Sequence, residues 1–196
     1  ADIHPNFQQK VKEFITHFKI KIEEYDELLT GNIIFQNRMK NVGYLSPEDA
    51  ISFGCTGPTA RGSGVSCDIR KYYPYEVYDK VEFNEVLETG GDSFARYMVR
   101  IREMQQSIRI IEQLIDNIPE GDFQAKTKAV LKLPKGEFYT RVETARGELG
   151  VYIVSEGGTT PYRIKFRSPG FSNLSALDHM ARGSKLGDLV AMMGTL

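Results

Sequence analysis

Residues 92–118 read DSFARYMVRIREMQQSIRIIEQLIDNI, and this stretch decides the fold. Apolar side chains recur in it at alternating spacings of four and three, at Tyr97, Ile101, Met104, Ile108, Ile111, Ile115 and Ile118. That spacing predicts a helix that begins at Asp92-Ser93 and ends before Pro119. Because about three heptads is the shortest convincing coiled coil, we expect the core helix of a helical bundle, with a coiled-coil dimer as the alternative.

A second apolar repeat lies upstream and predicts an amphipathic helix of about five or six turns. Its members are Phe7, Val11, Phe14, Phe18, Ile22, Tyr25 and Leu29, and Thr30-Gly31 ends it. A short helix is expected over residues 33–39. Ser46 and Pro47 then mark another helix start, as N-cap and first-turn residue, and Gly54 can supply the left-handed residue that stops this helix.

Downstream of Glu137 the apolar period changes from that of a helix to that of a strand. Residues 138–139, 150–154 and 162–166 alternate apolar and polar side chains, and a Gly-Gly pair at 157–158 joins the last two as a hairpin. Two short helices are expected over residues 173–181 and 186–193. The prediction is one α+β domain over residues 1–196, mostly helical to 130, an antiparallel sheet over 131–170 and terminal helices over 171–196.

The composition excludes several classes of protein but does not indicate a particular function. The chain has 25 basic and 26 acidic residues in 196, so no global field favours nucleic acid. It has no run of about 18 apolar residues that could span a membrane and no opening signal segment. Its two cysteines, Cys55 and Cys67, are too few for a disulfide framework or a four-ligand metal site, which fits a reducing compartment. Because Ala1 stands without an initiator Met, we expect a piece of a longer protein.

Chemistry-bearing residues are sparse. Residues 57–64, GPTARGSG, place small residues on both sides of Arg61, which allows a close backbone approach around a fixed charge. Such a loop either lines a cavity or packs on a neighbouring helix with Arg61 paired to an acid, and the sequence leaves both open. The three histidines, His4, His17 and His179, are scattered, and a structural or solvated role is expected for each.

A second charged cluster surrounds the expected sheet. It consists of Glu143, Arg146, Glu148, Arg163 and Arg167. Ion pairs within the protein are the expected role, and Glu143, Arg146 and Arg163 are the predicted centre of this network.

Short motifs follow one another through most of the chain. They are Leu28-Leu29-Thr30-Gly31-Asn32, Gly57-Pro58, Arg61-Gly62-Ser63-Gly64, Asp68-Ile69-Arg70-Lys71, Pro74-Tyr75, Gly91-Asp92, Arg96-Tyr97, Arg100, Glu103-Met104, Arg146-Gly147-Glu148, Pro161-Tyr162-Arg163 and Pro169-Gly170-Phe171. In this order they resemble the C-terminal part of the hydrogenase-like large subunit, of 49 kDa type, of the proton-pumping NADH:quinone oxidoreductase, complex I. No single motif would be specific.

The resemblance implies a fold related to the large subunit of nickel–iron hydrogenases, in which the old metal cavity has become the head of a quinone tunnel. It implies that a partner subunit holds the terminal [4Fe–4S] cluster and that other subunits hold FMN and NADH. This chain would bind no metal or cofactor itself. It would lie peripherally at the cytoplasmic face of a bacterial inner membrane, against the cluster-bearing subunit and the membrane arm.

The candidate lining of the quinone cavity under this resemblance is Arg61, Ser63, Gly64, Asp68, Arg70 and Met193. No catalytic residue is expected here, because the His and Tyr that bind the quinone head group in the family belong to an N-terminal half that this chain lacks. The chain alone should therefore be inactive, and its uncovered apolar surface should favour self-association.

Two alternatives remain open at the level of sequence. The chain could be a purely structural scaffold whose residues never meet quinone. It could also come from a membrane-bound energy-converting nickel–iron hydrogenase, although neither Cys55 nor Cys67 has the spacing of a Cys-x-x-Cys pair. Lys185 departs from the family pattern, since many relatives have a His at this position.

Overall fold

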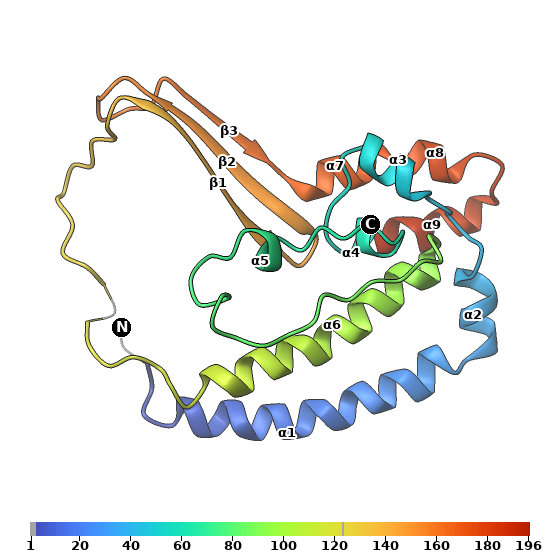
Figure 1. Cartoon of the computed structure of the whole chain (residues 1–196). Coiled ribbons are helices and arrows are strands. Elements are labelled where there is room, and N and C mark those ends of the chain that lie inside the picture. The colour runs from blue at the N-terminus through green and yellow to red at the C-terminus, as the bar shows by residue number, and fades with distance from the viewer. Residues whose placement is uncertain (1–2, 123) are drawn as a thin grey trace.

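The computed structural model describes residues 3–122 and 124–196 (Figure 1). Its elements are α1 (Phe7–Tyr25), the π-helical turn η1 (Asp26–Thr30), α2 (Ile33–Met39), α3 (Pro47–Ser52), α4 (Pro58–Arg61), α5 (Ile69–Tyr72), α6 (Ser93–Leu114), β1 (Gly136–Thr144), β2 (Gly147–Ser155), β3 (Arg163–Arg167), α7 (Pro169–Ser175), α8 (Leu177–Ala181) and α9 (Leu186–Thr195). This mixture of helices with one small antiparallel sheet confirms the expected α+β class.

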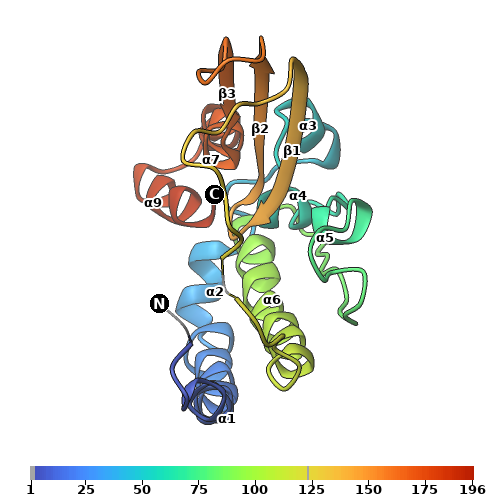
Figure 2. The same ribbon diagram turned by 90° about the vertical axis from the view of Figure 1, so that its left-hand side faces the viewer.

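The two long helices, α1 and α6, lie side by side at one edge of the molecule (Figures 1 and 2). Ile15 and Ile22 of α1 pack there against Ile108 of α6. The N-cap of α6 is the predicted one, because an Asp92 carboxylate oxygen accepts a hydrogen bond from the Ala95 amide at 2.8 Å. The partner helix therefore comes from the same chain, as the bundle interpretation requires.

The apolar repeat predicted from Tyr97 to Ile118, called the seam below, accounts for only part of the side-chain burial of α6. Ile111 is 39% exposed, whereas Val99 and Ile110 are buried although they lie off the seam. The reason is that α6 packs on several sides, against α1 and also against α4 and α9. The helix ends at Leu114, earlier than predicted, and the Asn117 side chain donates a hydrogen bond to the Gln113 carbonyl at 3.2 Å.

The sheet has the order β1-β2-β3 with both pairs antiparallel, as predicted, and it starts at residue 136 where 131 was expected. The register aligns Phe138, Ile153 and Ile164, which therefore share one face. Phe138 is 42% and Ile164 46% exposed. The strands extend away from the helices (Figure 1), so this apolar face lacks a covering layer over much of its length.

A second core joins the middle of the chain to its C-terminal helices, and Leu45, Ala176 and Met192 are fully buried in it. The cap of α3 is confirmed, since Ser46 Oγ accepts from the Asp49 amide at 3.0 Å. Two other predictions are corrected. The single helix expected over 173–181 is two helices, α7 and α8, because the chain turns at Ala176. The first of them, α7, begins before residue 173, at Pro169, which is a favoured first-turn residue.

Up to residue 130 the described part of the chain contains helices and irregular segments and no strand. Residues 73–92, 115–122 and 124–135 contain no helix or strand. By contrast, the segment 57–64, expected to be a loop, contains the single turn of α4, which Pro58 opens. None of the helices in the described part of the chain is long and apolar enough to cross a membrane.

Candidate functional site

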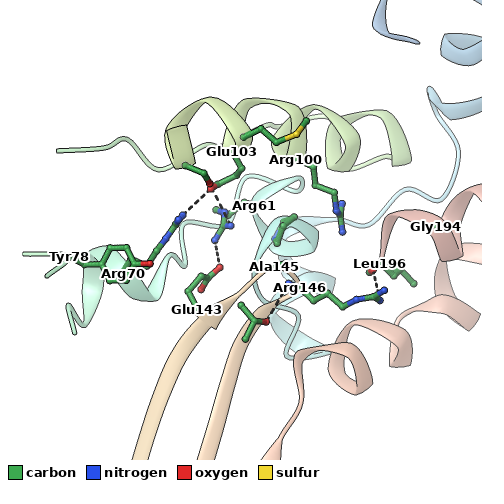
Figure 3. Close-up of a pocket in the computed structure, with 14 residues that line it drawn as sticks. Arg61, Arg70, Tyr78, Arg100, Glu103, Glu143, Ala145, Arg146, Gly194 and Leu196 are labelled. Atoms are coloured by element: carbon green, nitrogen blue, oxygen red, sulfur yellow. Dashed lines mark hydrogen bonds and ion pairs between the residues drawn. The ribbon is translucent and has the colours of Figure 1, made fainter. Parts of the chain in front are cut away.

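A cavity of about 530 Å³ lies where α4, α6, the β1–β2 turn and the end of α9 meet (Figure 3). Its lining is rich in charged side chains and includes a few apolar ones. The lining residues are Pro58, Arg61, Arg70, Tyr78, Arg100, Glu103, Met104, Ser107, Glu143, Thr144, Ala145, Arg146, Gly194 and Leu196.

Two glycines bring the β1–β2 turn into the wall of this cavity. Gly57 has φ +64°, and a Cβ built on it would lie 2.4 Å from the Gly147 Cα. Gly147 also has positive φ, and a Cβ there would lie 2.7 Å from the Thr56 carbonyl carbon. Neither position therefore accepts a side chain without moving backbone. The Glu148 amide donates to Thr56 Oγ1 at 3.1 Å and fixes this close approach.

One side of the cavity is formed by four charged residues, Arg61, Arg70, Glu103 and Glu143 (Figure 3). Asp68, which does not line the cavity, extends them to an ion-pair chain of five. Arg61 Nη1 donates to Glu143 Oε1 at 2.9 Å, and Arg61 Nη2 lies 3.4 Å from Glu103 Oε1. Arg70 Nη2 donates to Glu103 Oε2 at 3.0 Å and to Asp68 Oδ2 at 2.6 Å. The Arg61 side chain is only 2% exposed. These buried ion pairs hold the five side chains in fixed positions, because a side chain that moved away would leave its partner as an uncompensated buried charge.

The pKa values of two acids in this ion-pair chain, Glu143 and Asp68, are shifted in opposite directions. Burial raises the pKa of Glu143 above its ordinary value, and the neighbouring Arg61 offsets this effect only in part. Burial also pushes the pKa of Asp68 upward, but the hydrogen bond and the charge of Arg70 outweigh it, so the pKa of Asp68 is lowered. Asp68 therefore stays ionised to lower pH than an ordinary aspartate, while Glu143 takes up a proton more readily than an ordinary glutamate.

This difference predicts a pH dependence of folding stability. A raised pKa in the folded state means that, above about pH 4.5, the unfolded chain loses the Glu143 proton before the folded chain does. The wild-type free energy of unfolding should then fall, relative to that of Glu143→Gln, as pH rises from about 4.5. Urea unfolding between about pH 4 and 7 measures it, with the exposed Glu156→Gln as control. A constant difference between wild type and Glu143→Gln would contradict the raised pKa.

The opposite side of the cavity is basic. Arg100 reaches into it from α6, and Arg146 extends from the β1–β2 turn towards the end of α9 (Figure 3). Arg146 Nη1 donates to the Leu196 carbonyl oxygen at 3.3 Å, and Arg100 Nη1 donates to the Arg96 carbonyl oxygen at 2.9 Å. The cavity is thus polarised, with carboxylates at one side and unneutralised guanidinium groups at the other.

Of the six cavity candidates that the sequence suggested, Arg61 and Arg70 line the cavity. The sequence left two roles open for the loop at residues 57–64, lining a cavity or pairing Arg61 with an acid. Arg61 has both roles, since it lines the cavity and is paired with Glu143 and Glu103. Asp68 lies behind Arg70 as its partner and as the N-cap of α5, where it accepts from the Arg70 amide at 3.0 Å.

The other three candidates lie elsewhere. Ser63 is buried and donates its hydroxyl to the Leu45 carbonyl at 2.8 Å, which makes it part of the core packing. Gly64, with φ +81°, turns the chain next to Thr89. Met193 is 53% exposed on the outer side of α9, and its neighbour Met192 is buried. The helical period places adjacent residues on different faces, so the apolar signal at this position was ambiguous.

The expected ion pairs around the sheet form with different partners. Glu143 pairs with Arg61, and Arg146 bonds to a backbone carbonyl. Arg163 is exposed on β3 and takes part in none of the ion pairs between described residues. Arg167 donates to the carbonyl oxygens of Glu148 and Gly54, at 2.6 and 2.7 Å, and so ties the sheet to the loop before α4.

Sequence reasoning assigned no site role to Glu103 and Arg100. With Arg96 they occupy spacings of four and three along α6, so a charged stripe faces the interior beside the apolar seam. A charged stripe on a helix is ordinarily its solvated face, and for this reason the signal was not interpreted as a site. The stripe is recognisable only when the rest of the helix is known to be buried.

The isolated histidines and cysteines lie outside this cavity. His179 Nε2 is 3.2 Å from Asp49 Oδ2 at the protein surface. Burial raises the pKa of Cys55 and of Cys67 to about 11, so both remain thiols at neutral pH. Lys185 precedes α9, where its amide donates to Asp188 Oδ2 at 3.3 Å, at the end of this helix opposite to the cavity.

Comparisons with known proteins identify the family. The family model of the respiratory-chain NADH dehydrogenase 49 kDa subunit matches residues 1–133 and 126–196. The C/D subunit of the NADH-quinone oxidoreductase of Bacteroides fragilis is 56% identical over 196 residues, which are 100% of this chain and 37% of that protein. The D 2 subunit of the NADH-quinone oxidoreductase of Solibacter usitatus is 47% identical over 195 residues, 100% of this chain and 53% of that protein.

A more distant relative is the H 1 subunit of the NAD(P)H-quinone oxidoreductase of Gloeobacter violaceus, 39% identical over 220 residues, 100% of this chain and 56% of that protein. The chain thus spans about half the length of these relatives, or less. Because the family model and the relatives cover it from end to end, the chain belongs to the 49 kDa subunit family of the respiratory-chain NADH dehydrogenase.

Proposed function

We propose that this chain forms part of the wall of a quinone-binding cavity in an NADH:quinone oxidoreductase, and that the cavity lined by Arg61 and Arg100 is that site. The observation that carries the proposal is the composition of the cavity. A quinone head group has two carbonyl oxygens that need hydrogen-bond donors and a flat ring that needs apolar contacts. The guanidinium groups supply the donors, and Met104, Pro58 and Leu196 supply apolar surface.

The role of this chain is to bind and orient the quinone and to exclude water. Electrons would come from an iron–sulfur cluster in a partner subunit, fed from NADH through FMN in further subunits. The ion-paired Arg61 is held on two sides by Glu143 and Glu103, so its position does not depend on the ligand. Glu143, with its raised pKa, can hold a proton beside the cavity.

A bulky substitution at the rim tests the proposal. Ser107 lies on α6, is exposed and lines the cavity, so Ser107→Trp puts an indole into the opening. In the assembled enzyme we expect the apparent KM for quinone to rise about tenfold or more, the loss of roughly 1.4 kcal/mol of binding. Oxidation of NADH by an artificial acceptor that bypasses the quinone should not change.

The matched control is Gln105→Trp, which adds the same bulk to an exposed position of α6 outside the cavity. An unchanged KM in Ser107→Trp would favour the alternative that this chain is a scaffold that never touches quinone. The buried ion pairs of Arg61 and Arg70 support the scaffold alternative, because such ion pairs would also connect α4, α5, α6 and β1 in a protein that binds no quinone there.

A further inference from the structure

Arg100 and Arg146 are the two arginines of the cavity lining that have no acid partner among the described residues, and Arg100 is the one on α6. Within the part of the chain that the structure describes, its one hydrogen bond goes to the Arg96 carbonyl oxygen at 2.9 Å, and it forms no ion pair. The nearby acids Glu103 and Glu143 are already engaged by Arg61 and Arg70. A half-buried guanidinium with no acid is costly for a folded protein unless an anion joins it in the working state.

The neighbours of Arg100 increase this cost. Burial, followed by repulsion from Arg146 and Arg61, lowers the pKa of Arg100 to about 10, so the group is still charged at neutral pH. Arg146 extends into the same end of the cavity, where Gly194 and Leu196 close the wall (Figure 3). Arg100 and Arg146 thus share one end of the cavity, and each bonds there to a backbone carbonyl oxygen and to no carboxylate of the described residues.

We infer that Arg100 binds an anionic oxygen, and that the ligand which carries this oxygen is the quinone in its reduced, singly protonated form. The inference rests on the proposed function. A neutral quinone that takes two electrons from the partner's iron–sulfur cluster and one proton becomes a monoanion, and a second proton on the remaining oxygen completes the quinol. Arg100 stabilises the negative charge in the interval before that second proton arrives.

The other side of the cavity cannot take this role. There Glu143 and Glu103 flank Arg61, so an anionic oxygen would meet two carboxylates as well as the guanidinium. The polarisation of the cavity therefore gives the ligand a direction, with its anionic oxygen at the side of Arg100 and Arg146.

Two quinone analogues of matched shape test this in the assembled enzyme. One is a hydroxyquinone that is ionised at neutral pH, and the other is its methoxy derivative, which has no ionisable group. We expect wild type to bind the ionised analogue about tenfold or more tightly than the neutral one. Arg100→Gln should lose that preference but keep its affinity for the neutral analogue, and Arg100→Lys should keep part of the preference.

The control is Arg102→Gln, which removes the same charge from the same helix at an exposed side chain outside the cavity, and it should behave as wild type. A preference that persists in Arg100→Gln, or is absent from wild type because an acidic group of a neighbouring chain fills the site, overturns the inference but leaves the proposed function standing. Failure of wild type to bind either analogue overturns both. Arg100→Lys keeps the test valid if Arg100→Gln does not assemble.

Discussion

Gly57→Ala is expected to lower the free energy of unfolding by roughly 3 kcal/mol or more. Gly57 combines φ +64° with ψ −147°, a region that residues with a Cβ rarely enter. The added methyl would also lie 2.4 Å from the Gly147 Cα, and backbone cannot rotate away as a flexible side chain can. Relief of the clash requires the β1–β2 turn to move away from α4, which would also open the cavity between them. Urea unfolding of the purified chain measures the loss.

Gly54→Ala separates the two causes. Gly54 also has positive φ, +65°, but nothing lies within 4 Å of a Cβ built there. This variant should therefore lose only about 1–2 kcal/mol, the cost of the left-handed conformation alone. Equal losses at the two positions would show that the close approach of Gly57 and Gly147 contributes nothing.

Arg96→Met is expected to cost roughly 2–4 kcal/mol of folding stability. The Arg96 side chain is fully buried and donates four hydrogen bonds, to the carbonyl oxygens of Gly91 and Gly43 and to the hydroxyls of Ser93 and Thr195. The substitution leaves two buried carbonyls without this donor, at about 1–3 kcal/mol each. Release of a buried charge offsets part of that loss, since burial and Arg100 already lower the pKa of Arg96 to about 10.

The same change at Arg102, whose side chain is 50% exposed and paired with Glu88, should alter stability by less than about 1 kcal/mol. Thermal and urea unfolding of the two variants, made side by side, give the comparison. A loss at Arg96 no larger than that at Arg102 would mean that Arg96 does not hold the N-terminal turn of α6, the loop at Gly43 and the end of α9 together.

The sequence was most informative where local chemistry determines local structure. The caps at Asp92 and Ser46 and the strands β2 and β3 are predicted correctly, because each depends on neighbouring residues. The boundaries of α6 and α7 were missed where a turn or a proline competes with the apolar period.

The cavity was harder to predict, because contacts between distant residues create it. Arg61 and Glu143 are 82 positions apart, and nothing local indicates that they meet. The glycines at 57 and 147 were visible as small residues, but their role comes from mutual approach, which one sequence does not show. The family resemblance supplied the expectation of a cavity, and four of its six candidates, Ser63, Gly64, Asp68 and Met193, fall outside the lining.

Photo-crosslinking of the assembled enzyme with a quinone that carries a photoreactive group on its ring tests the central claim most directly. Peptide mapping should place the label on α6 between Arg100 and Ser107, on the β1–β2 turn, or on the last residues of α9, all of which line the cavity. Excess unlabelled quinone should suppress it. Label confined to α1 or to other subunits, with none on these three segments, would contradict the account.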